Sequence, residues 1–180
     1  MTDQSDFLAV TINEFRKLKT LAEKALAQVD DARFFTTLDP ESNSLALIVK
    51  HIAGNMRSRW TGFLTSDGEK PDRHRDSEFL HEGESRADIM AMWENGWKLL
   101  FEALTPLKPA DLSRTVMIRD EPHSVLKAIQ RQLGHYCMHV GQIVFLAKHL
   151  TADHWKSLSV PRGQSEQVNL RMMKRSESNK

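Results

Sequence analysis

The 180-residue chain has only one cysteine, Cys137, so it cannot be a small domain held together by disulfides. It also lacks an excess of either charge, because 25 lysines and arginines face 24 aspartates and glutamates and leave a net charge of +1. A protein that binds nucleic acid mainly by neutralising phosphates normally has a clear basic excess. The composition therefore argues against nucleic acid as a partner.

Long apolar runs and targeting signals are missing as well. No stretch approaches the roughly 20 apolar residues that a transmembrane helix needs. The first six residues are polar and acidic, whereas a secretory signal begins with a basic segment followed by an apolar one. Together with the unpaired cysteine, these absences favour a cytoplasmic protein with no membrane partner.

Glycine and proline are scarce, at 8 and 6 residues, and this scarcity favours long uninterrupted helices. Apolar residues recur at three- and four-residue steps in four stretches, at about 3–29, 45–64, 85–105 and 125–150. Ser44, Ser85 and Ser124 stand where helix N-caps are expected, and the spacing of Ser85 and Asp88 predicts a capping box. Four amphipathic helices without a convincing sheet predict an all-α four-helix bundle in a single domain, 1–180.

The segments between and after these helices differ in character. Residues 65–84 are highly charged, and an unstructured connection of this length is uncommon in a compact domain, so this loop is either a functional lid or poorly ordered. A β-prone run at 115–118, followed by turn-like residues at 120–122, predicts a small hairpin or irregular insert before the last long helix. Residues 151–180 form a carboxy-terminal extension, with one short helix expected after Ser165.

Histidine, by contrast, is plentiful, with eight residues. His135 and His139 are four positions apart, so they lie on one helix face one turn apart and can share a divalent metal ion. Gln142 joins the same column, which borders the apolar stripe and should face the bundle. The alternative is that the pair lies at the surface or the core boundary without a ligand.

A second polar column, formed by His51, Asn55 and Arg59, lies on the helix expected at 45–64. It drifts toward the apolar stripe, where a guanidinium must either pair with an acceptor or open onto a cavity. If this helix neighbours the last long helix, His51 completes a three-histidine site with open coordination positions, which is typical of a catalytic metal. The alternative is that His51 hydrogen-bonds within the core while Arg59 forms a salt bridge.

The remaining histidines and the cysteine are weak candidates for chemistry. Five histidines lie in the charged loop, beside a proline, or near the end of the last long helix: His74, His81, His123, His149 and His154. Cys137 is two positions from each histidine of the pair, so it points away from them and is expected to be an inert core residue.

Several glycines fall inside the expected helices, where each costs up to about 1 kcal/mol relative to alanine. These are Gly54, Gly62, Gly96, Gly134 and Gly141. The cost indicates either close helix packing or room for a ligand, and packing is the simpler interpretation.

The segment LALIVKHIAGN at 45–55, followed far downstream by HYCMHVGQ at 135–142, resembles the DinB/YfiT-like superfamily of small four-helix-bundle metalloproteins. The resemblance covers about residues 1–150. It implies one divalent metal ion, often nickel or zinc, held by His51, His135 and His139. Better characterised members are thiol-dependent transferases or isomerases, which implies a low-molecular-weight thiol as a further cofactor. Three further segments resemble a branch of this superfamily that is defined as a domain of unknown function. They are GNMRSRW at 54–60, DGEK at 67–70 and WKSLSVPRGQS at 155–165.

These features predict a metal-dependent transferase or hydrolase acting on a small molecule, with water or a cofactor thiol as the nucleophile. Asn55 and Gln142 would orient a bound group, and Arg59 would pair with a carboxylate or phosphate of the substrate. The alternative is a non-catalytic helical bundle with a structural or vestigial metal site, whose exposed apolar strip forms a homodimer. A homodimer is expected for the enzyme as well.

Overall fold

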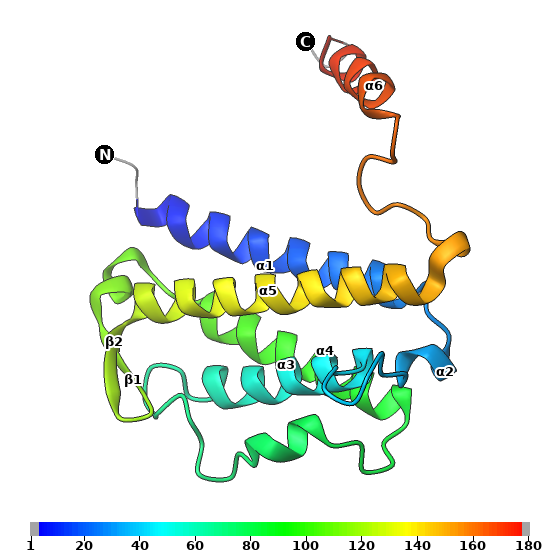
Figure 1. Ribbon diagram of the computed structural model, residues 1–180. Coiled ribbons are helices and arrows are strands. Elements are labelled where there is room, and N and C mark those ends of the chain that lie inside the picture. Colours follow the sequence, from blue (N-terminus) through cyan, green and yellow to red (C-terminus); the bar gives the residue numbers. More distant parts are fainter. Residues whose placement is uncertain (1–3, 178–180) are drawn as a thin grey trace.

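The computed structural model describes residues 4–177, and its architecture is the predicted all-α bundle (Figure 1). The four long helices are α1 (Gln4–Leu26), α3 (Leu45–Trp60), α4 (Arg86–Leu104) and α5 (Val125–Thr151). Helix α1 packs along α5, helix α3 packs along α4, and α3 also contacts α5. The contact between α3 and α5 positions the candidate site, because these two helices carry the predicted metal ligands.

Serine caps determine where three of these helices begin. The hydroxyls of Ser44 and Ser124 each accept a hydrogen bond from the backbone N–H three residues further on, at 3.2 and 3.1 Å. Ser85 and Asp88 form the predicted capping box, in which the Ser85 N–H donates to the Asp88 carboxylate at 2.9 Å. Since such a cap stabilises a helix by about 1 kcal/mol, these starting points could be predicted from local sequence.

Helix α3 is shorter than the periodicity predicts. It ends at Trp60 instead of residue 64, because Thr61 is extended and Gly62 follows with a φ of 60°. This left-handed conformation is one that glycine adopts at little cost. The prediction that Gly62 lies inside a helix is therefore wrong, and Gly62 instead forms the turn after α3.

Short elements complete the chain between and after the long helices. They are α2 (Asp31–Phe34), η1 (Arg75–Phe79), η2 (Pro109–Ser113), η3 (Ala152–His154) and α6 (Ser165–Glu177). Helix α6 is the short carboxy-terminal helix that was predicted, and it lies apart from the bundle after an extended connection (Figure 1). Within the described part of the chain, none of the helices combines the length and the apolar character that crossing a bilayer requires.

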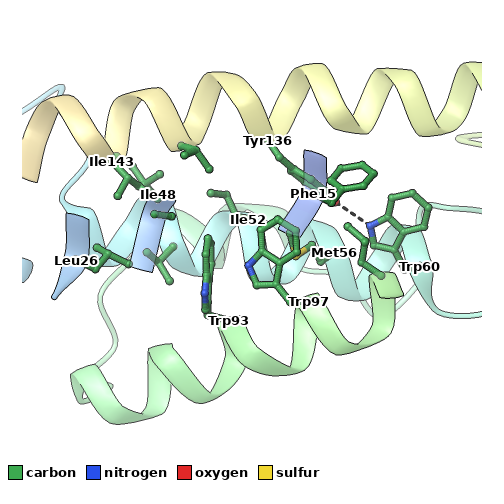
Figure 2. Close-up of a cluster of buried hydrophobic side chains, with 14 of the residues drawn as sticks. Phe15, Leu26, Ile48, Ile52, Met56, Trp60, Trp93, Trp97, Tyr136 and Ile143 are labelled. Atoms are coloured by element: carbon green, nitrogen blue, oxygen red, sulfur yellow. Dashed lines mark hydrogen bonds between the residues drawn. The ribbon is translucent and has the colours of Figure 1, made fainter. Parts of the chain in front are cut away.

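One aromatic side chain from each long helix meets in the centre of the core (Figure 2). The ring of Phe15 lies edge-on to Trp60 and Trp97, with centroids 6.3 and 6.4 Å apart. It also lies 6.0 Å from the ring of Tyr136. The buried Tyr136 hydroxyl accepts from the Trp60 Nε1–H at 3.1 Å and donates to Asn55 Oδ1 at 3.0 Å. This satisfied polar network couples α5 to α3 and orients Asn55.

The predicted hairpin lies before α5, where β1 (Thr115–Ile118) pairs antiparallel with β2 (Glu121–Ser124). Its turn residues, Arg119 and Asp120, have φ values of 56° and 59°, which are unfavourable for residues with side chains. The Asp67 carboxylate accepts hydrogen bonds from the N–H groups of both residues, at 2.9 and 2.8 Å. Such an anion in a backbone nest stabilises the turn and fastens the charged segment after α3 to the hairpin.

The other end of the charged segment 65–84 is attached to α3. The buried Lys50 ammonium donates to the Leu80 carbonyl at 2.8 Å and forms an ion pair with Glu84. Although burial by itself would raise it, the hydrogen bond from Lys50 lowers the pKa of Glu84 to about 2, so the carboxylate stays charged in mild acid. The segment is thus held at both ends, and between them η1 lies against α3.

Candidate metal centre and the cavity beside it

Three histidine side chains meet where α3 lies next to α5. His135 Nε2 is 3.0 Å from His139 Nε2 and 3.4 Å from His51 Nε2. The three candidate ligand atoms all lie within 4.8 Å of one another. Nitrogens bound to one ion at about 2.0–2.1 Å stand roughly 3.0–3.4 Å apart in octahedral or tetrahedral geometry. The two distances to His135 Nε2 therefore suit ligands of one divalent ion.

The hydrogen bonds of the other ring nitrogens determine the tautomers. His51 Nδ1 lies 2.8 Å from a carboxylate oxygen of Glu78, and His139 Nδ1 lies 2.7 Å from Gln142 Oε1. Because both partners are acceptors, each Nδ1 carries the proton and each Nε2 keeps a lone pair. When His135 is also protonated on Nδ1, three Nε2 lone pairs converge and can share one cation; in the other tautomer the His135 Nε2–H proton lies between them. The donor set therefore fits a divalent ion.

Burial keeps the imidazoles of His135 and His139 in the form that binds metals. Desolvation, followed by the charges of His139 and His51, lowers the pKa of His135 to about 3. Desolvation also lowers the pKa of His139, although its hydrogen bond with Gln142 opposes the shift. Since neutral imidazole is the metal ligand, His135 and His139 can bind a cation at neutral pH.

Glu78 is a buried carboxylate of η1 that the sequence analysis missed. Besides its contact with His51, it is held by Arg73, whose Nε and Nη2 donate to its two oxygens at 2.8 and 2.9 Å. Desolvation would raise the pKa of Glu78, but the hydrogen bonds from His51 and Arg73 lower it, so the carboxylate is charged. The Phe79 ring stacks on His51 with centroids 4.7 Å apart. The charged segment therefore supplies the groups that orient His51.

Gly54 allows Glu78 to approach α3 this closely. A Cβ at position 54 would lie 2.7 Å from Glu78 Cδ, and Arg73 together with His51 prevents the carboxylate from moving aside freely. We expect Gly54→Ala to lower metal affinity by about 10- to 100-fold, the range seen when a ligand's orienting partner is disturbed. We also expect the free energy of unfolding to fall by about 1–3 kcal/mol. Calorimetric titration with Zn²⁺ and urea unfolding measure the two effects.

Gly134→Ala is the matched control, because a Cβ at position 134 meets no atom within 4 Å. This variant should bind metal as the parent does and gain up to about 1 kcal/mol of stability from helix propensity. Equal metal affinities for the Gly54 and Gly134 variants would contradict the role given to Gly54.

The interpretation that helical glycines allow close packing is correct for Gly96, where a Cβ would lie 3.1 Å from Met56. It is wrong for Gly134 and Gly141, which face open space.

A cavity of about 200 Å³ lies beside two of the histidines. Its lining is polar and consists of His51, Asn55, Arg59, Arg73, Arg75, Arg119, Arg131, Gln132 and His135. Because the side-chain oxygen of Asn55 accepts a hydrogen bond from the Tyr136 hydroxyl, the amide nitrogen of Asn55 is the group left for the cavity. The buried Oε1 of Gln132 has no hydrogen-bond partner among the described residues. The cavity thus offers the Asn55 amide nitrogen and several guanidinium groups next to the histidines.

The structure places two of the three predicted substrate-binding residues at the cavity. Asn55 and Arg59 line the cavity, but Gln142 does not, and it holds His139 instead. The buried Arg59 guanidinium donates to the Gly68 carbonyl and, at 3.3 Å, to the Glu69 carboxylate. Much of its pairing capacity is therefore used within the protein.

The lone cysteine is not part of the site. Cys137 is exposed on α5, so the prediction that it lies in the core is wrong. Desolvation and the negative charge of Glu14 raise the pKa of its thiol, which disfavours the reactive thiolate. Within residues 4–177, none of the other five histidines joins the three-histidine cluster.

Comparison with known proteins yields one family. The model of a protein family of unknown function, DUF1572, matches residues 3–164, which include every helix from α1 to α5 and the hairpin. No curated protein matches this sequence.

Proposed function

The chain belongs to the DUF1572 family, and we propose that it is a DinB/YfiT-like metal-binding protein that acts as a metal-dependent transferase or hydrolase on a small molecule. The observation that carries the proposal is the convergence of the His51, His135 and His139 nitrogens beside a polar cavity. Structural zinc sites usually have four protein ligands, whereas here the Glu78 carboxylate faces His51 Nδ1 and the cluster in the described residues has three histidines. Three ligands leave coordination positions for a substrate.

We expect the ion to be nickel or zinc. When bound, it would act as a Lewis acid and lower the pKa of water or of a cofactor thiol. The chain's own residues would do the rest. Glu78 and Gln142 hold the rings of His51 and His139, and Asn55 would donate to a substrate carbonyl or hydroxyl from its free amide nitrogen. Because Cys137 lies outside the site, thiol chemistry would require a sulfur brought by a low-molecular-weight cofactor.

A turnover screen tests this function. Metal-loaded protein is offered esters, amides and electrophilic small molecules, each with and without a low-molecular-weight thiol. Turnover that requires the thiol would identify a transferase, and turnover without it would identify a hydrolase. His139→Ala, which removes one ligand, should be inactive on any substrate found. Metal binding with no turnover in either arm would favour the non-catalytic homodimer.

A further inference from the structure

We infer that the arginine-lined cavity binds a compact, doubly charged oxyanion, the anionic end of the substrate, mainly through Arg75 and Arg131. This rests on the proposed function, since it names the chemical class of that site's substrate. A phosphate or phosphonate group and a dicarboxylate share the required chemistry. The pairing predicted for Arg59 is thereby reassigned to Arg75, in the charged segment 65–84, and to Arg131 on α5.

The charges around the cavity do not balance. Five arginines line it, and among the described residues only Glu69 and Glu78 form ion pairs with any of them. Glu69 contacts Arg59, Arg73 and Arg119, while Glu78 contacts Arg73. Even when Asp67, which accepts from the Arg119 N–H, is counted with Glu69 and Glu78, two positive charges remain in excess, and such an excess in a partly enclosed space raises the local concentration of anions. The missing negative charge is what an anionic ligand would supply.

Of the five arginines that line the cavity, Arg75 and Arg131 have no carboxylate within 4.0 Å among the described residues. The Arg75 guanidinium carbon lies 5.3 Å from the centroid of the Phe79 ring, and that ring stacks on His51. Arg131 lies one helical turn before His135 on α5, so both side chains occupy the same face. Both arginines line the cavity together with His51 and His135.

The dimensions and donors of the cavity restrict the ligand further. Its volume of about 200 Å³ is below the roughly 300–1,000 Å³ of pockets for drug-sized ligands, so a small metabolite fits best. Guanidinium groups bind phosphate and carboxylate through paired N–H donors.

Anion titration of the metal-free and the metal-loaded protein tests the inference. Inorganic phosphate and malonate are titrated calorimetrically at constant ionic strength into the parent, into the double variant Arg75→Gln/Arg131→Gln, and into Arg16→Gln. The last is a matched control, because Arg16 also lies 5.3 Å from an aromatic ring, that of Phe101, but does not line the cavity.

We expect the parent to bind at least one of these anions and the double variant to bind it roughly tenfold or more weakly. Arg16→Gln should bind as the parent does. Tighter phosphate binding would indicate a phosphoryl or phosphonate ligand, and tighter malonate binding a dicarboxylate. Failure of both anions to bind, or equal affinity in the double variant, would overturn the inference. Since the metal-free protein is tested separately, a failure of metal binding remains distinguishable from a failure of the anion site.

Discussion

Replacing His135 by alanine is expected to abolish stoichiometric binding of a divalent ion. The Nε2 atom of His135 lies within 3.4 Å of those of His51 and His139. Its loss therefore removes the central ligand and leaves only two. Disturbing a partner of a ligand already costs about 10- to 100-fold in affinity, so losing the ligand itself should cost more than about 100-fold. Elemental analysis of purified protein and calorimetric titration with Zn²⁺ and Ni²⁺ measure the effect.

His149→Ala is the matched control for this experiment. His149 lies on the same helix but is exposed and outside the three-histidine cluster, so its replacement should leave the metal content unchanged. Circular dichroism of both variants verifies that α5 still folds. Equal metal content in the parent protein and in the folded His135→Ala variant would refute the metal centre.

Replacing Glu78 by alanine should be the most destabilising of the changes considered. The side chains of Glu78 and Arg73 are only 8% and 4% exposed, and removing one partner of a buried ion pair costs about 3–5 kcal/mol. Because Arg73 keeps its contact with Glu69, we expect a loss of about 3 kcal/mol in the free energy of unfolding. Urea unfolding at neutral pH measures this loss.

The same residue should also affect metal affinity, and a conservative change separates the two effects. Glu78→Gln retains an oxygen that can accept the His51 Nδ1–H but removes the charge that pairs with Arg73. It should therefore bind metal more tightly than Glu78→Ala, while still being less stable than the parent. Glu102→Ala, an exposed change on α4, should shift stability by no more than about 0.5 kcal/mol. If Glu78→Ala were as stable and as metal-competent as Glu102→Ala, the buried ion pair would have no structural role.

Local sequence determined the helices and the histidine pair. Apolar periodicity and serine caps involve residues within a few positions of one another, so the bundle, its capping box and the one-turn spacing of His135 and His139 were predictable. The short hairpin was predictable for the same reason, from a β-prone run and a turn. The predicted end of α3 was wrong because the apolar periodicity continues to residue 64, whereas the backbone leaves the helix before Gly62.

Tertiary contacts decided the position of the groups around the histidines. Glu78 and Arg75 lie in a charged segment without periodicity, whose position depends on Asp67 binding a turn some 50 residues away and on Lys50 holding its far end. The one local signal was Gly54, a helical glycine three residues after His51, and its meaning became clear only once Glu78 lay against it.

The sequence by itself therefore determined that His135 and His139 could share a metal ion, because ligand spacing on a helix follows from helix geometry, whereas His51 joins them only through the contact of α3 with α5. Only the tertiary structure decided what surrounds those residues. It paired Arg59 within the protein, assigned Gln142 to His139, and left Arg75 and Arg131 facing the cavity. The physical reason is that the partner of a charged side chain is chosen by proximity in space, which a pattern along the chain does not encode.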